Sequence, residues 1–143
     1  MAIHGGCACG AVRYELARDE LPKVYCCHCR DCQTRSGSAF NQTAFVRVSE
    51  MEITGSLAVY ERQMPGGHAG RVSICAKCSS PLFSISTQSS DMAGLRVGSL
   101  DDSDGIVPVA HIWTSRRQPW VTIPEDAPQW EEAPTPEFYR LLA

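Results

Sequence analysis

The sequence predicts a small, mainly β protein built from antiparallel sheets. Short segments that alternate apolar and polar residues recur along the whole chain, and turn signals separate them. Of the 143 residues, 11 are Gly and 9 are Pro, which favours short strands and turns over long helices. Because no long helical pattern intervenes between the strand candidates, an antiparallel all-β architecture is expected.

The expected elements are short. The alternation over 11–16 predicts a half-buried strand, and 23–25 predicts a second strand that leads into the cysteines. One or two helical turns are expected over 31–36, ended by Gly37. Further strands are expected at 44–48, 51–54, 57–61, 71–75, 82–86, 94–97 and 110–113, with turn signals at 55–56, 65–67 and 101–105. The Pro-rich stretch from Pro119 is expected to be extended, with a short helix over 136–142.

The bulk composition predicts one domain over 1–143, with a core of about 4–123 and an extended tail and short helix over 124–143. Hydrophobic residues make up 43% and charged residues 20%, as in ordinary globular proteins. No apolar run approaches the roughly 20 residues that cross a bilayer, and the start lacks the features of a signal peptide. A cytoplasmic protein is therefore expected. The net charge of −3 gives no electrostatic case for a nucleic-acid or membrane partner.

The eight cysteines indicate metal binding. Disulfides are disfavoured by a reducing cytosol and by the spacing, because Cys7 and Cys9 are too close to bridge comfortably and Cys26 and Cys27 are adjacent. Thiols that only fill a core would be scattered, whereas these fall in three tight groups.

The first and third groups together supply the ligands of a closed site. Cys7 and Cys9 are two residues apart, so on an extended segment both point to one face. Cys75 and Cys78 have the spacing of half a zinc knuckle. Four thiolates complete a tetrahedral, structural zinc site that would tie the N-terminal segment to the middle of the chain.

The middle group predicts a second, open zinc site. Cys27, Cys29 and Cys32 can lie on one side of a tight loop, and three ligands leave the fourth position for water or substrate. The alternative is a closed site in which Cys26 or His28 is the fourth ligand, although both are expected to point away. The pair Cys29 and Cys32 also has the C-x-x-C form of a thiol oxidoreductase, which the β-rich pattern disfavours.

With these clusters placed, the chain resembles the glutathione-dependent formaldehyde-activating enzyme family from Gly6 to about Trp130. The hallmark Cys-His-Cys-x-x-Cys stands at 27–32. The other matching pieces are Gly6–Tyr14, Ser36–Phe40, Arg71–Cys78, Pro81–Phe83, Val97–Asp101, Pro108–Ile112 and Trp120. One departure is Ser79, where the family usually has Gly.

The resemblance implies a β-tent of small antiparallel sheets organised around two zinc ions per chain. It implies that Cys7, Cys9, Cys75 and Cys78 hold the structural zinc. It also implies that Cys27, Cys29 and Cys32 hold the catalytic zinc. The implied reaction is of the carbon–sulfur lyase type, in which glutathione or another small thiol joins formaldehyde or another small aldehyde. Glutathione is anionic, so Arg30, Arg35 and Arg71 are candidates to bind its carboxylates.

A non-enzymatic zinc-binding or protein-interaction module is the alternative function, since centromere protein V shares the domain. His111 lies in an apolar strand, where a core histidine with satisfied hydrogen bonds is expected more often than a catalyst.

Overall fold

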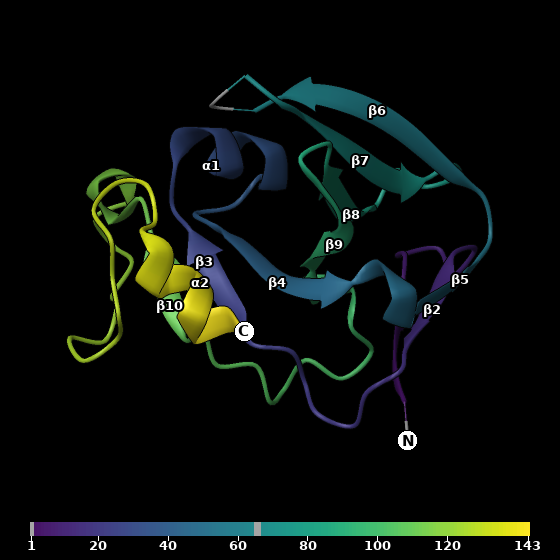
Figure 1. Ribbon diagram of the computed structural model, residues 1–143, viewed down its shortest axis with the longest axis horizontal. Helices are drawn as coiled ribbons and strands as arrows, with labels where there is room; N and C mark the ends of the chain where they lie inside the picture. Colours follow the sequence, from purple (N-terminus) through teal and green to yellow (C-terminus); the bar gives the residue numbers. More distant parts are fainter. Residues whose placement is uncertain (1, 65–66) are drawn as a thin grey trace. The chain divides into compact units, whose positions relative to one another are not determined.

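The structure is a computed structural model that describes residues 2–64 and 67–143 (Figure 1). The described residues contain ten β-strands, two short α-helices and three 3-10 turns, which confirms the mainly β prediction. No helix within these ranges is long and apolar enough to cross a membrane. The chain divides into two compact units, one formed by 1–22 and 45–105 and the other by 23–44 and 106–143.

The first unit contains two groups of antiparallel strands. Strands β1 (Ile3–Gly6), β2 (Arg13–Leu16) and β5 (Met51–Thr54) form a three-stranded sheet in the order β1-β2-β5. Strands β6 (Leu57–Gln63), β7 (Ala69–Cys75), β8 (Pro81–Ser86) and β9 (Ser89–Arg96) pair in chain order. Alternation places Tyr14 and Leu16 in the core and their neighbours outside, as expected for a half-buried strand.

The second unit is built on strand β3 (Val24–Cys27). One edge of β3 pairs antiparallel with the start of β4 (Asn41–Arg47), and the other edge pairs in parallel with β10 (Ala110–Ile112). The expectation of antiparallel pairing was wrong for β10. A parallel pair needs a long connection rather than a hairpin, and residues of the first unit lie between β3 and β10 in the sequence.

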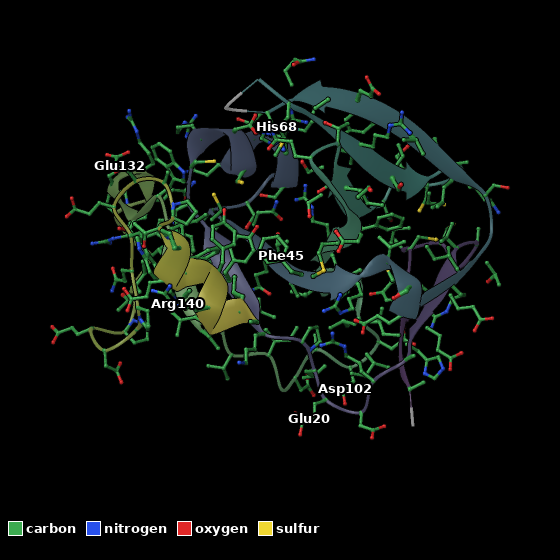
Figure 2. All side chains as sticks on the ribbon, viewed as in Figure 1. Glu20, Phe45, His68, Asp102, Glu132 and Arg140 are labelled. Carbon is green, nitrogen blue, oxygen red and sulfur yellow. The ribbon has the colours of Figure 1, made fainter. Side chains whose placement is uncertain are left out.

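The C-terminal tail adds to the second unit through both its backbone and its helix. His111 N–H donates to the Pro128 carbonyl, and Trp130 N–H donates to the His111 carbonyl, so the tail pairs along β10. Helix α2 (Pro136–Leu142) coincides with the predicted 136–142. It buries Phe138 against Tyr25 and Trp130, with ring centroids 5.0 and 5.6 Å apart, whereas Arg140 and the tail residue Glu132 are exposed (Figure 2).

The remaining strands differ from the expected ranges mainly at their ends. Strand β1 was not predicted, because its two glycines weaken the strand signal. Strand β10 ends at Ile112, one residue earlier than predicted, because the φ of 56° at Trp113 is incompatible with a strand. Of the predicted turn at 65–67, Pro65 and Gly66 lie outside the described residues.

Ser79 occupies a left-handed backbone position in the turn between β7 and β8. Its φ is 66°, and its N–H donates to the carbonyl of Cys75 at 2.9 Å. This conformation crowds any residue that has a Cβ atom, and glycine adopts it without that cost.

We expect Ser79→Gly to raise the free energy of unfolding by about 0.5–1 kcal/mol, because relief of the left-handed strain outweighs the greater entropy of the unfolded glycine. Chemical denaturation of the metal-loaded protein measures the change. Ser103→Gly is the matched control, because Ser103 is an exposed loop residue without a positive φ. Ser103→Gly should lower the free energy of unfolding slightly, and an equal loss of stability in Ser79→Gly would contradict the argument.

We expect Phe138→Ala to lower the free energy of unfolding by about 3–5 kcal/mol, the usual cost of emptying a buried phenylalanine site. Only 1% of Phe138 is exposed. Its neighbour Tyr139 is 54% exposed, so Tyr139→Ala should cost about 1 kcal/mol, mainly through its edge-to-face contact with Phe138. Comparable losses in the two variants would show that α2 is not anchored by Phe138.

Candidate metal centres

Four cysteine sulfurs converge in the first unit. Cys7 and Cys9 lie in the loop between β1 and β2, Cys75 ends β7, and Cys78 lies in the turn that follows. All four Sγ atoms lie within 4.8 Å of one another. Two separations are 3.6 Å (Cys7 to Cys9) and 3.8 Å (Cys9 to Cys75). Sulfurs at the corners of a tetrahedron around zinc are about 3.8 Å apart, so the group fits this metal.

Backbone N–H groups point at these sulfurs. Val12 N–H donates to Cys7 Sγ at 3.2 Å, and the N–H groups of Lys77 and Cys78 donate to Cys75 Sγ at 3.3 and 3.4 Å. The Val12 N–H lowers the pKa of the Cys7 thiol. Such bonds stabilise thiolates, which are the form that binds metal.

Ser80 adds a side-chain hydrogen bond to another sulfur of this group, Cys78 Sγ. Its hydroxyl lies 3.1 Å from Cys78 Sγ and lowers the pKa of that thiol to about 5. The same oxygen accepts the Ala8 N–H at 3.0 Å. Ser80 therefore joins the two loops that carry the four sulfurs.

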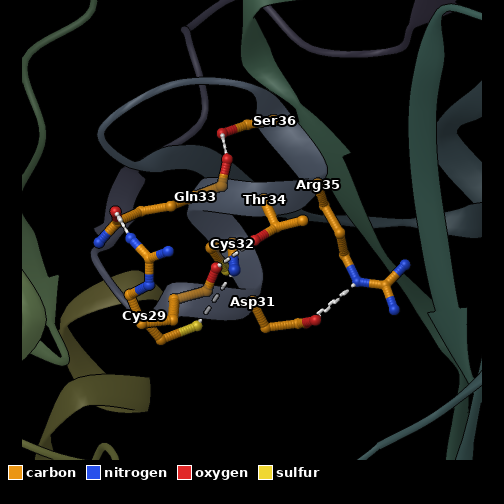
Figure 3. A network of polar contacts seen from close by, with 8 residues as sticks. Cys29, Asp31, Cys32, Gln33, Thr34, Arg35 and Ser36 are labelled. Carbon is orange, nitrogen blue, oxygen red and sulfur yellow. Dashed lines mark hydrogen bonds and ion pairs between the residues drawn. The ribbon is translucent and has the colours of Figure 1, made fainter.

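Three further sulfurs converge in the second unit. Cys27 ends β3, and Cys29 and Cys32 lie at the start of helix α1 (Arg30–Ser36); the three Sγ atoms lie within 4.8 Å of one another. Cys29 is the N-cap of α1, and its sulfur accepts the Cys32 N–H at 3.3 Å (Figure 3).

Burial and crowding disfavour the ionised form of the triad thiols. The side chain of Cys32, and then burial, raise the pKa of Cys27. Burial raises the pKa of Cys29. Three neighbouring thiols resist ionising together, and a divalent cation reverses this preference because thiolates are its ligands.

Cys26 and His28 neighbour the triad in sequence, but neither contributes an atom to the group of converging ligand atoms. Cys26 is 1% exposed, and burial raises the pKa of its thiol to about 12. The His28 ring lies 3.0 Å from His111, Nε2 to Nδ1, and burial lowers the pKa of His28 to about 4. Burial lowers the pKa of His111 as well, which favours a neutral pair in which one ring nitrogen donates to the other. His28 Nδ1 is buried without a hydrogen-bond partner among the described residues.

Gln33 organises the loop around the triad, and sequence reasoning missed it. The amide nitrogen donates to the carbonyls of His28 at 2.9 Å and Arg116 at 3.0 Å. The amide oxygen accepts from Arg30 Nη1 at 3.0 Å and Gln118 Nε2 at 3.2 Å. All the hydrogen-bonding capacity of this buried amide is used. No local signal marks it, because two of its partners are 83 and 85 residues away in sequence.

The three candidate arginines have different surroundings. Arg30 lies in α1 and bonds Gln33. Arg35, one turn later, forms an ion pair with Asp31 at 3.0 Å (Figure 3). Arg71 belongs to β7 in the first unit, where its side chain is 63% exposed and lies 3.4 Å from Glu61. The structure therefore brings Arg30 and Arg35 to the helix of the triad and places Arg71 in the other unit.

The surroundings of Cys29 and Cys32 disfavour the oxidoreductase alternative. The motif does follow a strand and begin a helix, as in such enzymes. However, α1 has only seven residues, and the strand that follows runs antiparallel to β3 rather than closing a parallel βαβ unit. The Cys27 sulfur also lies against the pair.

Comparison with known proteins agrees with this arrangement. The family described as glutathione-dependent formaldehyde-activating enzyme matches residues 2–116. A comparison with curated proteins found no significant match. A crystal structure of a Rhodobacter sphaeroides protein, a structural-genomics target, is similar in fold, with a TM-score of 0.56 and 22% identity over 73% of this chain and 97% of that one. Since the family match spans most of the sequence, the chain belongs to the glutathione-dependent formaldehyde-activating enzyme family.

Proposed function

We propose that this protein is a zinc-dependent enzyme of the carbon–sulfur lyase type that joins a small thiol such as glutathione to formaldehyde or a similar small aldehyde. The observation that carries the proposal is the triad of Cys27, Cys29 and Cys32, in which three sulfurs converge without a fourth protein ligand atom among the described residues. That donor set is typical of a zinc site that does chemistry.

The metal assignment rests on ligand chemistry. Cytosolic sites made only of cysteine favour zinc among the common divalent metals. The triad would hold one zinc ion, which supplies a Lewis-acidic position open to the reactants. Cys7, Cys9, Cys75 and Cys78 would hold a second, structural ion whose coordination is complete.

The reaction needs no oxidant or reductant. The sulfur of the thiol forms a bond to the aldehyde carbon, the carbonyl π bond breaks, and the proton lost by the thiol ends on the oxygen as a hydroxyl. The residues around the triad serve to orient and bind. Gln33 holds the loop through the carbonyl of His28. The positive charge of Arg30 on α1 favours a thiol substrate that carries a negative charge.

We also propose that the chain acts as one functional domain over 1–143 and that its partners are small molecules rather than nucleic acid or a membrane. A cytoplasmic setting suits the cysteines, since thiols stay reduced there.

We expect native mass spectrometry to find two zinc ions per chain, one of which a mild chelator removes first. The open triad binds through three ligands and should release its ion more readily than the four-cysteine site. Cys29→Ser should remove the labile ion and leave the resistant one. Two equally resistant ions would indicate a closed second site and favour the binding-module alternative.

We expect the protein to accelerate hemithioacetal formation from glutathione and formaldehyde above the uncatalysed rate, and Cys29→Ser to lower kcat/KM by about 100-fold or more through loss of the metal. Cys26→Ala is the matched control, because Cys26 is the adjacent buried cysteine outside the triad, and it should stay active. No acceleration at micromolar zinc-loaded protein would overturn the formaldehyde reaction.

A further inference from the structure

Strand β6 (Leu57–Gln63) lies at an edge of its sheet in the first unit. It pairs with β7 on one side, and no strand among the described residues pairs with its other side (Figure 1). Its register with β7 is uninterrupted over seven residues, and it contains no proline or lysine. Natural edge strands are usually protected by such residues, by bulges or by a covering segment. Strand β6 lacks the first two protections.

The middle of β6 is also uncovered on both faces of the sheet. The residues from Ala58 to Glu61 are all exposed. Val59 is 58% exposed and Tyr60 is 43% exposed. Because neighbouring residues of a strand point to opposite faces, each face carries one of these apolar side chains. A β-branched residue beside an aromatic is more typical of a paired strand than of a protected edge.

Two hydrogen bonds identify which backbone groups of β6 point away from β7. Ala76 N–H donates to the Ser56 carbonyl at one end of the strand pair, and Met64 N–H donates to the His68 carbonyl at the other. Alternate residues of an antiparallel strand bond to its partner. The even-numbered residues of β6 therefore bond to β7. The odd-numbered residues direct their N–H and C=O groups to the open edge, and these are Leu57, Val59, Glu61 and Gln63.

A second copy of β6 complements this edge in one register. A two-fold axis makes the two strands antiparallel, and hydrogen bonds form where outward-facing residues lie opposite one another. With the axis at Tyr60, Leu57 of one copy lies opposite Gln63 of the other, so all seven residues overlap. Moving the axis to Glu61 would place two carboxylates opposite each other, which is destabilising. Moving it to Val59 would shorten the paired segment.

We propose that two copies of this chain pair antiparallel through β6, with Tyr60 opposite Tyr60 on the two-fold axis. The charges of β6 support self-pairing, because Glu61 and Arg62 both lie near its C-terminal end. In the antiparallel arrangement they lie opposite the uncharged residues Val59 and Ala58 of the other copy, and no like charges are opposed. The two tyrosines form a non-hydrogen-bonded pair, in which side chains approach most closely.

Sedimentation velocity of the zinc-loaded protein, at micromolar to submillimolar concentrations, measures this association. We expect the parent to sediment as a dimer at the upper concentrations. Val59→Pro removes an outward N–H, which an edge strand tolerates, and should weaken the dimer Kd about tenfold or more. Val59→Thr is the matched control, because it keeps both the N–H and the β-branched shape, and it should dimerise nearly as well as the parent.

Charge variants at the axis test the register without a proline. Tyr60→Glu and Tyr60→Arg each place like charges opposite one another, so each alone should be mainly monomeric, whereas an equimolar mixture should form a heterodimer. Tyr139→Glu is the matched control, because Tyr139 is an exposed aromatic on α2 in the other unit, and it should remain dimeric. Zinc content and circular dichroism establish that each variant is folded.

Three results would overturn the β6 dimer. The first is a parent that stays monomeric at all these concentrations. The second is a dimer that both Tyr60 variants leave intact, since β6 would then lie outside the interface. The third is a dimer that is lost in both Tyr60 variants and does not form in their mixture, because Tyr60 would then contact a segment other than its own copy.

Discussion

The crowding of thiols is the constraint on which the two centres depend. Sulfurs within 4.8 Å of one another cannot all carry charge unless a cation lies among them. In the first unit, the N–H groups of Val12, Lys77 and Cys78 nevertheless point at sulfur, as they would at a thiolate. Placing four negative sulfurs next to one another is favourable only with a metal ion among them. An ion there would join segments that are 66 residues apart in sequence.

The loop of the three-cysteine triad is held differently. It is fixed mainly through His28 rather than through bonds to sulfur. The His28 N–H donates to the Ile112 carbonyl, its carbonyl accepts from Gln33, and its ring bonds His111. Neither nitrogen of the His28 ring belongs to the group of converging ligand atoms, which consists of the sulfurs of Cys27, Cys29 and Cys32. The middle residue of the motif therefore anchors the loop, and its two flanking cysteines point to the common centre.

Much of this arrangement could be predicted from the sequence because the informative patterns are local. Alternation along a strand placed Tyr14 and Leu16 inside, and cysteines two or three residues apart face one point by backbone geometry alone. The grouping of Cys7 and Cys9 with Cys75 and Cys78 followed from the ligand count that a tetrahedral ion requires.

The features that could not be predicted depend on contacts distant in sequence. Strand β10 pairs in parallel with β3 across more than 80 residues, and no periodicity within either strand specifies its partner. Gln33 looks like any polar helix residue until Arg116 and Gln118 are placed beside it. The distinction among Arg30, Arg35 and Arg71 likewise depends on which carboxylates reach them.

Gln33 connects the loop of the triad to two side chains beside helix α1, those of Arg30 and Gln118. Its amide nitrogen holds the loop between Cys27 and Cys29, while its amide oxygen holds Arg30 and Gln118. Replacing Gln33 would remove the donor to the carbonyls of His28 and Arg116 and the acceptor of Arg30 and Gln118. Replacing Arg30 would remove one of the two donors to the Gln33 amide oxygen and would leave the bonds from Gln33 to the backbone carbonyls in place. The position of the triad loop therefore depends on Gln33 more directly than on Arg30.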